Sequence, residues 1–311
     1  MKRLFLHFNA RKTTTRLFIH FGAHKTATTS LQLYFQEKVR WLRRHGITYI
    51  SPDTVNNQQL HLFLHGHRSQ PSETAGRHRS FLKKLIRTSG TSGFLISHES
   101  LFSFAGDPRK ERIYPSLQTA LKRFREINVF DAVSVKFALR EPAAFLQSIY
   151  LQNLGAKFTG PFERYSNSIN IQNVSWSPIV EQVENAGFDE VGWELYEDLG
   201  HLGSKQYLKL FTDWLRLPHN PSHELPRSNP SLSLVAARML QASGLTCKNV
   251  DAKKRYRLRN FLKKHFPVKQ YGKANFLTDD LKKRVRDELM EDHVSLFARL
   301  HRREDFGLWG C

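Results

Sequence analysis

The chain has 311 residues, of which 40% are hydrophobic and 12% aromatic. This composition excludes an intrinsically disordered chain, and the length fits a globular protein with a sizeable core. Lysine and arginine number 48 against 28 acidic residues, a net charge of +20. We therefore expect acidic partners, such as nucleic acid, anionic lipid, anionic glycan or a phosphorylated cofactor.

The two cysteines, Cys247 and Cys311, are too few for a disulfide framework or a cysteine zinc site, and they fit a reducing cytoplasm. The apolar run near the N-terminus is broken by His7, Asn9 and Arg11, so it does not form a signal-peptide core. No uncharged run approaches the length of a membrane span. We expect a cytoplasmic protein whose basic faces could still contact a membrane surface.

Residues 1–15 form a basic lead-in, followed by a short apolar strand over Arg16–Gly22. A loop rich in small and hydroxyl residues comes next, and apolar residues at helical spacing then predict a helix over Thr28–Arg44. Hydroxyl groups at its start can cap it. A strand, a polar loop and a helix in this order open a nucleotide-binding α/β unit.

Four further apolar runs predict strands, and the segments between them carry helical patterns. The strands are Ile47–Ile50, Gly93–Ser97, Ala132–Leu139 and Val191–Leu195, and the helices are Arg112–Arg125, Pro142–Leu154 and Lys205–Leu215. This alternation predicts an α/β fold with three layers, in which helices cover both faces of a mostly parallel central sheet. We expect one domain over residues 16–311, with residues 248–311 as a basic helical extension.

The loop after the first strand can bind an anion, because a helix N-terminus offers free N–H groups and Lys25 adds a positive charge. It is not a Walker A loop, since only two residues separate Gly22 from Lys25. The strand over Ala132–Leu139 is followed by Arg140 and not by an aspartate that could hold Mg²⁺. An ATPase or kinase is therefore disfavoured. By itself, the loop also fits an ordinary capped turn.

The segment HFGAHKTATTSLQ, from His20 to Gln32, resembles the 5′-phosphosulfate loop of bacterial and glycan-modifying sulfotransferases. These P-loop enzymes use 3′-phosphoadenosine 5′-phosphosulfate (PAPS) and release 3′-phosphoadenosine 5′-phosphate (PAP). Ala27 stands where the family usually has glycine, and its Cβ would be costly at positive φ. The resemblance implies that the cofactor binds Gly22, His24, Lys25, Thr26, Ala27, Thr28, Thr29 and Ser30.

A second segment contains Arg140, Pro142, Ser148 and Tyr150, and it resembles the family's 3′-phosphate site. Arginine gives a permanently charged, bidentate phosphate contact, and a serine two turns along the next helix can donate to the same anion. The resemblance implies that Arg140 and Ser148 bind the 3′-phosphate, which distinguishes PAPS from ATP.

Two later segments resemble cofactor-binding parts of the same family. The sequence YEDL places Tyr196 where the family has a tyrosine near the adenine. The segment Arg227–Ser233 resembles a loop that closes over the cofactor, which implies a cofactor contact by Arg227.

Sulfuryl transfer to a hydroxyl group needs a base near the acceptor and positive charge at the leaving oxygen. The resemblance implies a base at the end of a neighbouring strand, where His98 and Glu99 follow Gly93–Ser97. We favour Glu99, with His98 as the rival or as its hydrogen-bond partner. Lys25 would stabilise the departing PAP, and no metal ion is required.

The acceptor pocket is expected from the variable segments Asn56–Gly76 and Lys157–Pro178. His61, His65 and His67 have metal-like spacing, but a solvated histidine-rich loop explains them better. The basic run Lys253–Lys264 is interleaved with aromatic residues, which we expect to form a buried stripe under a solvated basic face. That stripe comprises Tyr256, Phe261 and Phe266.

These observations favour a PAPS-dependent sulfotransferase acting on a hydroxyl acceptor, with a carbohydrate as the expected acceptor. An anionic glycan or a lipid-linked molecule would also suit the basic surface, and no specific nucleic acid is expected. Two alternatives stay open, namely a polyanion- or nucleic-acid-binding protein on a degenerate P-loop scaffold and a P-loop kinase.

Overall fold

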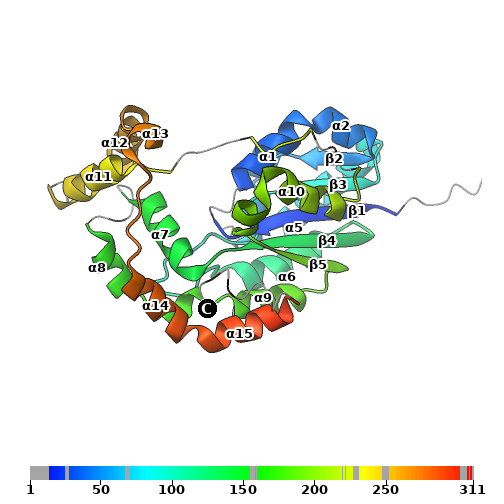
Figure 1. The fold of residues 1–311 in the computed structure, drawn as a ribbon. Coiled ribbons are helices and arrows are strands. Elements are labelled where there is room, and N and C mark those ends of the chain that lie inside the picture. Colours follow the sequence, from blue (N-terminus) through cyan, green and yellow to red (C-terminus); the bar gives the residue numbers. More distant parts are fainter. Residues whose placement is uncertain are drawn as a thin grey trace, which may run out of the picture.

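The computed structural model describes residues 14–24, 28–66, 71–154, 158, 160–218, 220, 222–226, 231–246, 252–301, 307 and 309. Its centre is a five-stranded parallel sheet with the strand order β2-β3-β1-β4-β5 (Figure 1). The strands are β1 (Arg16–Gly22), β2 (Ile47–Ile50), β3 (Gly93–Ser97), β4 (Ala132–Leu139) and β5 (Glu190–Leu195). The sequence predicted the bounds of the first four strands, and β5 begins one residue earlier than expected.

Helices cover both faces of the sheet, because alternate strand residues are apolar on both sides. On β1, Leu17, Ile19 and Phe21 belong to one buried cluster, and Phe18 belongs to the other. The smaller cluster lies under α1 (Thr28–Glu37), α2 (Val39–Arg44) and α10 (Asp198–Trp214). The larger lies under α4 (Leu60–Leu64), α5 (Pro71–Ser89), α6 (Leu117–Ile127) and α9 (Ser177–Glu184). The three-layer prediction is confirmed.

Three predicted helices differ from the observed ones. The helix expected over Thr28–Arg44 is interrupted at Lys38, and this lets α2 pack on β2. The helix expected from Arg112 begins at Leu117, because Tyr114 adopts a φ of 56° and Pro115 follows it. The helix expected over Lys205–Leu215 is the second part of α10, which is kinked at Gly203 with a φ of 74°.

The remaining helices before the C-terminal part are α3 (Pro52–Asn57), α7 (Pro142–Asn153), α8 (Phe162–Asn167) and the 3₁₀ turn η1 (Ile171–Val174). The helix α7 begins after Arg140 as predicted, and Glu141 caps it by accepting the N–H groups of Ala143 and Ala144 at 2.7 and 2.6 Å. This cap directs α7 away from the carboxyl end of β4.

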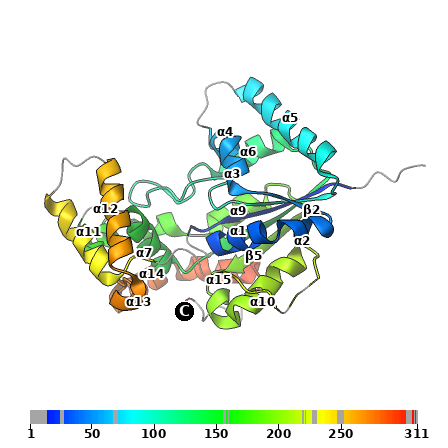
Figure 2. The same ribbon diagram turned by 90° about the horizontal axis from the view of Figure 1, so that it is seen from above.

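The chain from Leu234 onward, which includes the predicted extension over residues 248–311, contains two groups of helices (Figures 1 and 2). The first, α11 (Leu234–Thr246), α12 (Ala252–His265) and α13 (Val268–Tyr271), lies beside α7 beyond the carboxyl ends of the strands. The second, α14 (Asp279–Glu288) and α15 (Met290–Arg299), returns under the sheet, where α15 packs on α9. Within the described residues, no helix is long and apolar enough to cross a membrane.

The prediction of a buried aromatic stripe on α12 is wrong. Tyr256 and Phe261 are 56% and 55% exposed, whereas Leu262 is buried and Phe266 is half-buried. Because α12 packs on α11 through one side, the helical spacing of the aromatic residues does not bring them under cover.

Candidate functional site

The site lies where the strands end, and it begins at Gly22. This residue has a φ of 121°, and a Cβ built on it would lie 2.7 Å from the backbone nitrogen of Ala138. The next residue, Ala23, donates its N–H to the carbonyl of Ala138 at 2.8 Å. Glycine therefore allows the chain to leave β1 while staying in contact with β4.

The loop then leads to α1, whose first turn contains Thr28, Thr29 and Ser30. The predicted positions of Thr28–Ser30 at a helix N-terminus are confirmed, and such a terminus can bind an anion. Gln32 in the next turn donates to the carbonyl of Ser97 at 3.1 Å, which ties α1 to the end of β3. Lys25, Thr26 and Ala27 lie outside the described residues, so their roles stay predictions.

His24 is held by two hydroxyl groups. Its backbone N–H donates to the Tyr114 hydroxyl at 3.1 Å, and its Nδ1 lies 3.0 Å from the same oxygen. Its Nε2 lies 3.1 Å from Oγ of Ser100. The Tyr114 and Ser100 hydroxyl groups, one on each ring nitrogen, therefore fix the orientation of the His24 ring.

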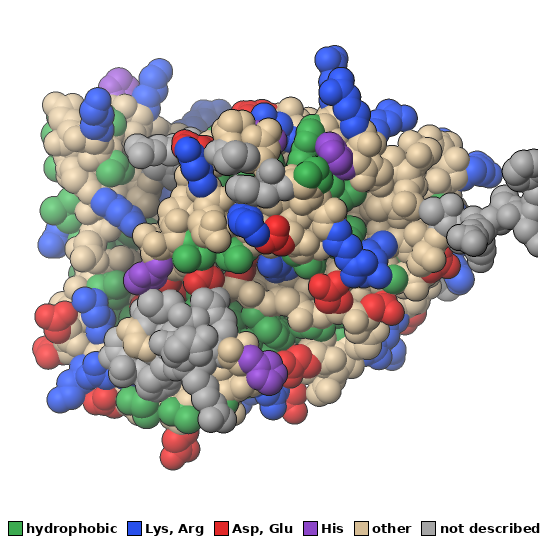
Figure 3. Space-filling model, turned by 45° about the vertical axis from the view of Figure 1, so that its right-hand side comes forward, with side chains coloured by type: hydrophobic (Ala, Val, Ile, Leu, Met, Phe, Trp, Pro, Cys, Tyr) green, Lys and Arg blue, Asp and Glu red, His purple; other side chains and the backbone are tan. Residues whose placement is uncertain are grey.

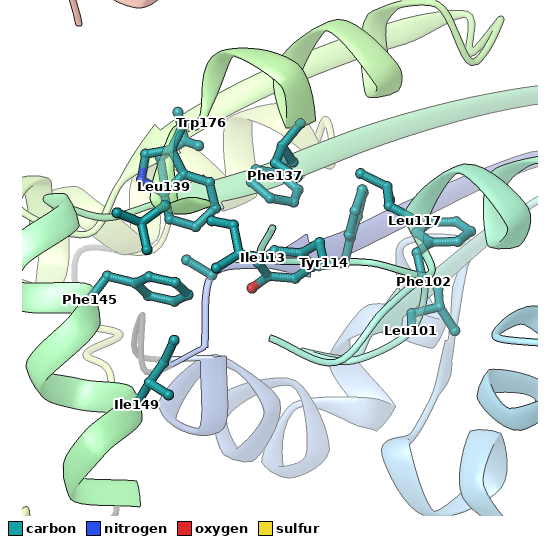
Figure 4. Close-up of a cluster of buried hydrophobic side chains, with 14 of the residues drawn as sticks. Leu101, Phe102, Ile113, Tyr114, Leu117, Phe137, Leu139, Phe145, Ile149 and Trp176 are labelled. Carbon is teal, nitrogen blue, oxygen red and sulfur yellow. The ribbon is translucent and has the colours of Figure 1, made fainter. Parts of the chain in front are cut away.

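Tyr114 connects this cluster to the core (Figure 4). Its ring lies 5.9 Å from that of Phe137 and 6.0 Å from that of Trp176. Burial raises the pKa of Tyr114 well above its ordinary value, and the nearby negative charge of Glu99 raises this pKa further. Tyr114 therefore stays protonated. The sequence prediction missed it, although a residue before proline is a signal of restricted backbone geometry.

His98 follows β3 and is 8% exposed. Its Nε2 donates to Oδ1 of Asn56 at 3.1 Å, and its Nδ1 has no hydrogen-bond partner among the described residues. The pKa of His98 is lowered to about 4, chiefly by burial and also by the positive forms of His61, His65 and His24. At neutral pH His98 is therefore uncharged, and its Nδ1 lone pair can accept a proton.

Glu99, the favoured base, is half-buried next to His98. Its neighbour in the chain, Ser100, lies 3.1 Å from Nε2 of His24, so Glu99 stands in sequence between His98 and this contact. The structure thus brings His98, Glu99 and His24 together at the carboxyl ends of β1 and β3.

His61 and His65 belong to this group, and their predicted solvated loop is wrong. The His61 ring stacks on that of His98 with centroids 5.5 Å apart, and Nε2 of His65 donates to the carbonyl of Ser100 at 2.8 Å. Phe104, 45% exposed, lies 4.7 Å from the His65 ring. Helices α3 and α4 fold this segment back over the end of β3. His67 lies outside the described residues.

Within the described part of the chain, no group of three or more histidine, cysteine or acidic side chains could hold a metal ion. The contacts of His61 and His65 with rings and carbonyl groups account for their burial. His61 and His65 thus pack around the end of β3 beside His98.

Arg140 lies at the end of β4, and its guanidinium sits 4.6 Å from the centre of the Tyr196 ring. Its carbonyl accepts the Trp176 indole N–H at 2.8 Å. Burial lowers the pKa of Arg140, while Tyr196, Glu197 and Glu141 raise it, and an arginine so placed keeps its charge. Arg140, predicted to bind the 3′-phosphate, and Tyr196, predicted to lie near the adenine, are thus in contact.

Ser148 lies on α7, two turns after Pro142, and is half-exposed. Arg227 lies outside the described residues, so its cofactor contact stays a prediction. Of the segment containing it, Ser233 caps α11 by accepting the N–H of Ala236 at 3.2 Å.

The acidic residues after Tyr196 tie the strand ends together. Glu197 accepts the backbone N–H of Glu141 at 3.1 Å and the indole N–H of Trp309 at 3.2 Å. Burial raises the pKa of Glu197, and these hydrogen bonds oppose that effect. Asp198 accepts the N–H of Leu195 at 3.1 Å. Because their oxygens accept protein donors, these carboxylates position Arg140 and Tyr196.

A buried polar layer supports the site from below, and sequence reasoning missed it. Nδ1 of His20 lies 2.9 Å from Oγ of Ser97, and Nε2 of His20 lies 3.4 Å from Oε1 of Glu194, which also accepts the Tyr207 hydroxyl at 2.9 Å. Lys136 donates to the carbonyl of Leu210 at 3.3 Å. The available signal was a polar residue inside an otherwise apolar strand: His20 in β1, Lys136 in β4 and Glu194 in β5.

A solved sulfotransferase structure shares this fold over most of both chains. The chain is 14% identical to a sulfotransferase from Alicyclobacillus acidocaldarius, with a TM-score of 0.51 over 94% of this chain and 98% of that one. It is 12% identical to the sulfotransferase domain of the Synechococcus PCC 7002 olefin synthase, with a TM-score of 0.40 over 81% of this chain and 96% of that one.

A third similar structure is retinol dehydratase in complex with androsterone and the inactive cofactor PAP. It is 12% identical, with a TM-score of 0.37 over 89% of this chain and 80% of that one. No protein-family model matches the sequence. No curated protein matches it either. The chain has the P-loop α/β fold of the sulfotransferases.

Proposed function

We propose that this protein is a sulfotransferase that transfers a sulfuryl group from PAPS to the hydroxyl group of a carbohydrate. The observation that most supports this function is the convergence of three segments at one sheet edge. These are the loop leading into α1, the His98–Glu99 pair after β3, and Arg140 with Tyr196 after β4 and β5. The first suits a 5′-phosphosulfate, and the third suits an adenosine with a 3′-phosphate.

The donor supplies a sulfur atom that forms a bond to the acceptor oxygen while its bond to the phosphate oxygen breaks, releasing PAP. The α1 N-terminus, with Lys25, would stabilise the charge on the departing phosphate. Glu99 would accept the acceptor proton, with neutral His98 as the rival base. His24, whose ring is oriented by Tyr114 and Ser100, would contact the donor at the same edge.

The first test measures transfer from radiolabelled PAPS. Glu99→Gln and Lys25→Ala should abolish transfer while circular dichroism shows an unchanged fold, because each removes a charge that the reaction needs. His98→Gln should reduce the rate less if Glu99 is the base, and more if His98 is. Full activity in both Glu99→Gln and Lys25→Ala would refute the assignment.

The carbohydrate part of the proposal is supported by Phe104 and His61. Phe104 presents an exposed ring beside the histidine cluster, and an aromatic ring suits the apolar face of a sugar. Phe104→Ala should therefore raise the KM for the acceptor and leave the KM for PAPS unchanged. An acceptor screen of glycans, including anionic and lipid-linked ones, would identify the substrate. A proportional rise in both KM values would contradict this role.

The two alternatives can be separated by ligand binding. A thermal shift with PAP but not with ATP and Mg²⁺ would support the proposal and oppose a kinase. This is the expected result, because Arg140 stands where a Mg²⁺-binding carboxylate would be needed. Oligonucleotide binding that persists at moderate salt, without a response to PAP, would instead favour a polyanion-binding protein.

A further inference from the structure

Half of the molecule's net charge is concentrated in a short part of the chain. Residues 231–278 contain eleven lysines and arginines and one acidic residue, a net charge of +10 out of +20. Helix α12 alone has seven basic residues and no acidic one. On the face shown in Figure 3, by contrast, positive and negative side chains are interspersed. The helices α11–α13 are therefore a local source of positive potential.

The same helices expose large apolar side chains. Ten such residues are exposed among the described residues of the chain, and half of them belong to α11 and α12. Phe261 and Tyr256 are 55% and 56% exposed, and the others are Leu234, Met239 and Leu258. Apolar groups gathered on a small surface mark a place of contact with another molecule or with a membrane.

The basic and aromatic residues share the outward side of α12. Arg257, Phe261 and Lys264 are separated by four and three residues, so they lie next to one another along the helix, and all three are exposed. The Phe261 ring rests on His265 with centroids 4.2 Å apart. Among the described residues, no ion pair involves Arg257 or Lys264. This side therefore offers uncompensated positive charge around an exposed ring.

We propose that the outward face of α11 and α12 docks onto an anionic lipid bilayer. A helix that carries aromatic and aliphatic side chains among lysines and arginines can lie in the interface of a membrane, with the rings at headgroup depth and the cations on the phosphates. A polyanionic glycan or nucleic acid would use the charges, but it would leave Leu258, Leu234 and Met239 exposed to water. The apolar side chains favour the lipid surface.

The position of the docking face suits this partner. Figures 1 and 2 show α11, α12 and α13 grouped at one end of the molecule, beside α7 and away from α2 and α5. The hydrogen bond from Gln241 of α11 to the Tyr150 hydroxyl of α7, at 2.8 Å, fixes this end to the α/β body. Docking would therefore hold the whole molecule at the surface without burying the sheet.

The test is co-sedimentation of the full chain with vesicles. Binding to vesicles of phosphatidylcholine and phosphatidylglycerol should exceed binding to phosphatidylcholine alone by about tenfold or more, and salt should weaken it. The double variant Phe261→Ser/Tyr256→Ser and the double variant Arg257→Gln/Lys264→Gln should each lose about tenfold or more.

Matched controls make the result specific. Arg40→Gln/Arg44→Gln on α2 removes the same charge from another exposed helix, and Val294→Ser removes an apolar group that is 55% exposed on α15. Both should bind vesicles as the unchanged protein does, and circular dichroism should show that every variant is folded.

A conservative variant gives an independent readout. Phe261→Trp should bind vesicles as the unchanged protein does. On addition of anionic vesicles, its tryptophan emission should shift to the blue more than that of the unchanged protein, because the new indole enters the interface. The proposal is overturned if both aromatic changes leave vesicle binding unaffected, or if the α2 control loses as much as the α12 charge variant. It is also overturned if the protein binds heparin or an oligonucleotide and only the Arg257→Gln/Lys264→Gln variant loses vesicle binding. That result would identify a surface for polyanions.

Discussion

The two halves of the candidate site are held in place by different interactions. Around β1 and β3, the hydrogen bonds join uncharged partners: hydroxyl groups of Tyr114 and Ser100 hold His24, and the amide of Asn56 holds His98. Around β4 and β5, charged groups dominate. Arg140 lies on Tyr196, and the carboxylates of Glu141 and Glu197 accept backbone and indole donors.

This difference fits the chemistry proposed for each half. A group that must take or direct a proton works best when its own charge is not fixed by an ion pair, and burial keeps His98 neutral. A group that recognises a 3′-phosphate must stay charged at every pH, and arginine does so. We therefore expect a change of pH to affect the first half through the protonation of His98. In the second half, we expect removal of the Arg140 charge to weaken the binding of PAP.

The largest effect is expected at Gly22, where the two halves meet. Gly22→Ala would combine a strained backbone with a Cβ only 2.7 Å from the nitrogen of Ala138. We expect a loss of about 4 kcal/mol or more in the free energy of unfolding, measured in urea. Gly46→Ala is the control, because Gly46 has a φ of 79° and no atom within 4 Å of a built Cβ. Gly46→Ala should lower the free energy of unfolding by about 1 to 2 kcal/mol. Equal losses in the two variants would contradict the close contact between Gly22 and Ala138.

The second effect is a loss of stability on acidification. The pKa values of His98 and of the remote His293 are each lowered to about 4, in both cases chiefly by burial. Between pH 6.5 and 4 the unfolded chain binds these protons and the folded chain does not, so stability is full above pH 6.5 and falls towards pH 4. Each histidine should account for up to about 3 kcal/mol.

Urea unfolding at a series of pH values measures this slope. His98→Gln should reduce the pH dependence of the free energy of unfolding by the contribution of one histidine. His293→Gln should reduce it in the same way, although His293 lies away from the site. If His98→Gln leaves the slope unchanged, the neutral state of His98 in the folded protein is wrong.

The third effect concerns the charged half and is expected in ligand affinity. Arg140→Gln should weaken PAP binding by about 10- to 100-fold, the range of a hydrogen bond to a charged group. Adenosine 5′-phosphate, which lacks the 3′-phosphate, should bind the variant nearly as well as it binds the unchanged protein. Isothermal titration calorimetry gives both constants. A similar loss for both nucleotides would show that Arg140 acts through Tyr196 and not on the 3′-phosphate.

The strands and the loop could be predicted because their signals are local. Continuous apolar runs that stop at Gly22, Ser97 and Leu139 determine both the strands and the edge at which they end. Arg140 and Glu99 could be predicted as neighbours of these ends. The parallel topology then brings them together, since all the carboxyl ends meet at one edge.

The rest depends on contacts between distant parts of the chain. Tyr114 is 90 residues from His24, and His65 reaches Ser100 across 35 residues. The spacing of His61 and His65 is the same in a solvated loop as in the observed cluster. On α12, periodicity shows that aromatic residues recur along a helix, but not whether another layer covers them, and here none of the described helices covers Phe261.

The smallest effect tests one of these distant contacts, the bond between Trp309 and the charged half. Trp309→Phe would remove the indole N–H that donates to Glu197 and keep an aromatic ring near His293 and Phe297. We expect a loss of about 1 kcal/mol in urea unfolding, the usual net value of one hydrogen bond. Trp214→Phe is the matched control, since the Trp214 indole N–H is buried without a partner among the described residues. The difference between the two variants isolates the bond to Glu197, and equal losses would show that Trp309 contributes only by packing.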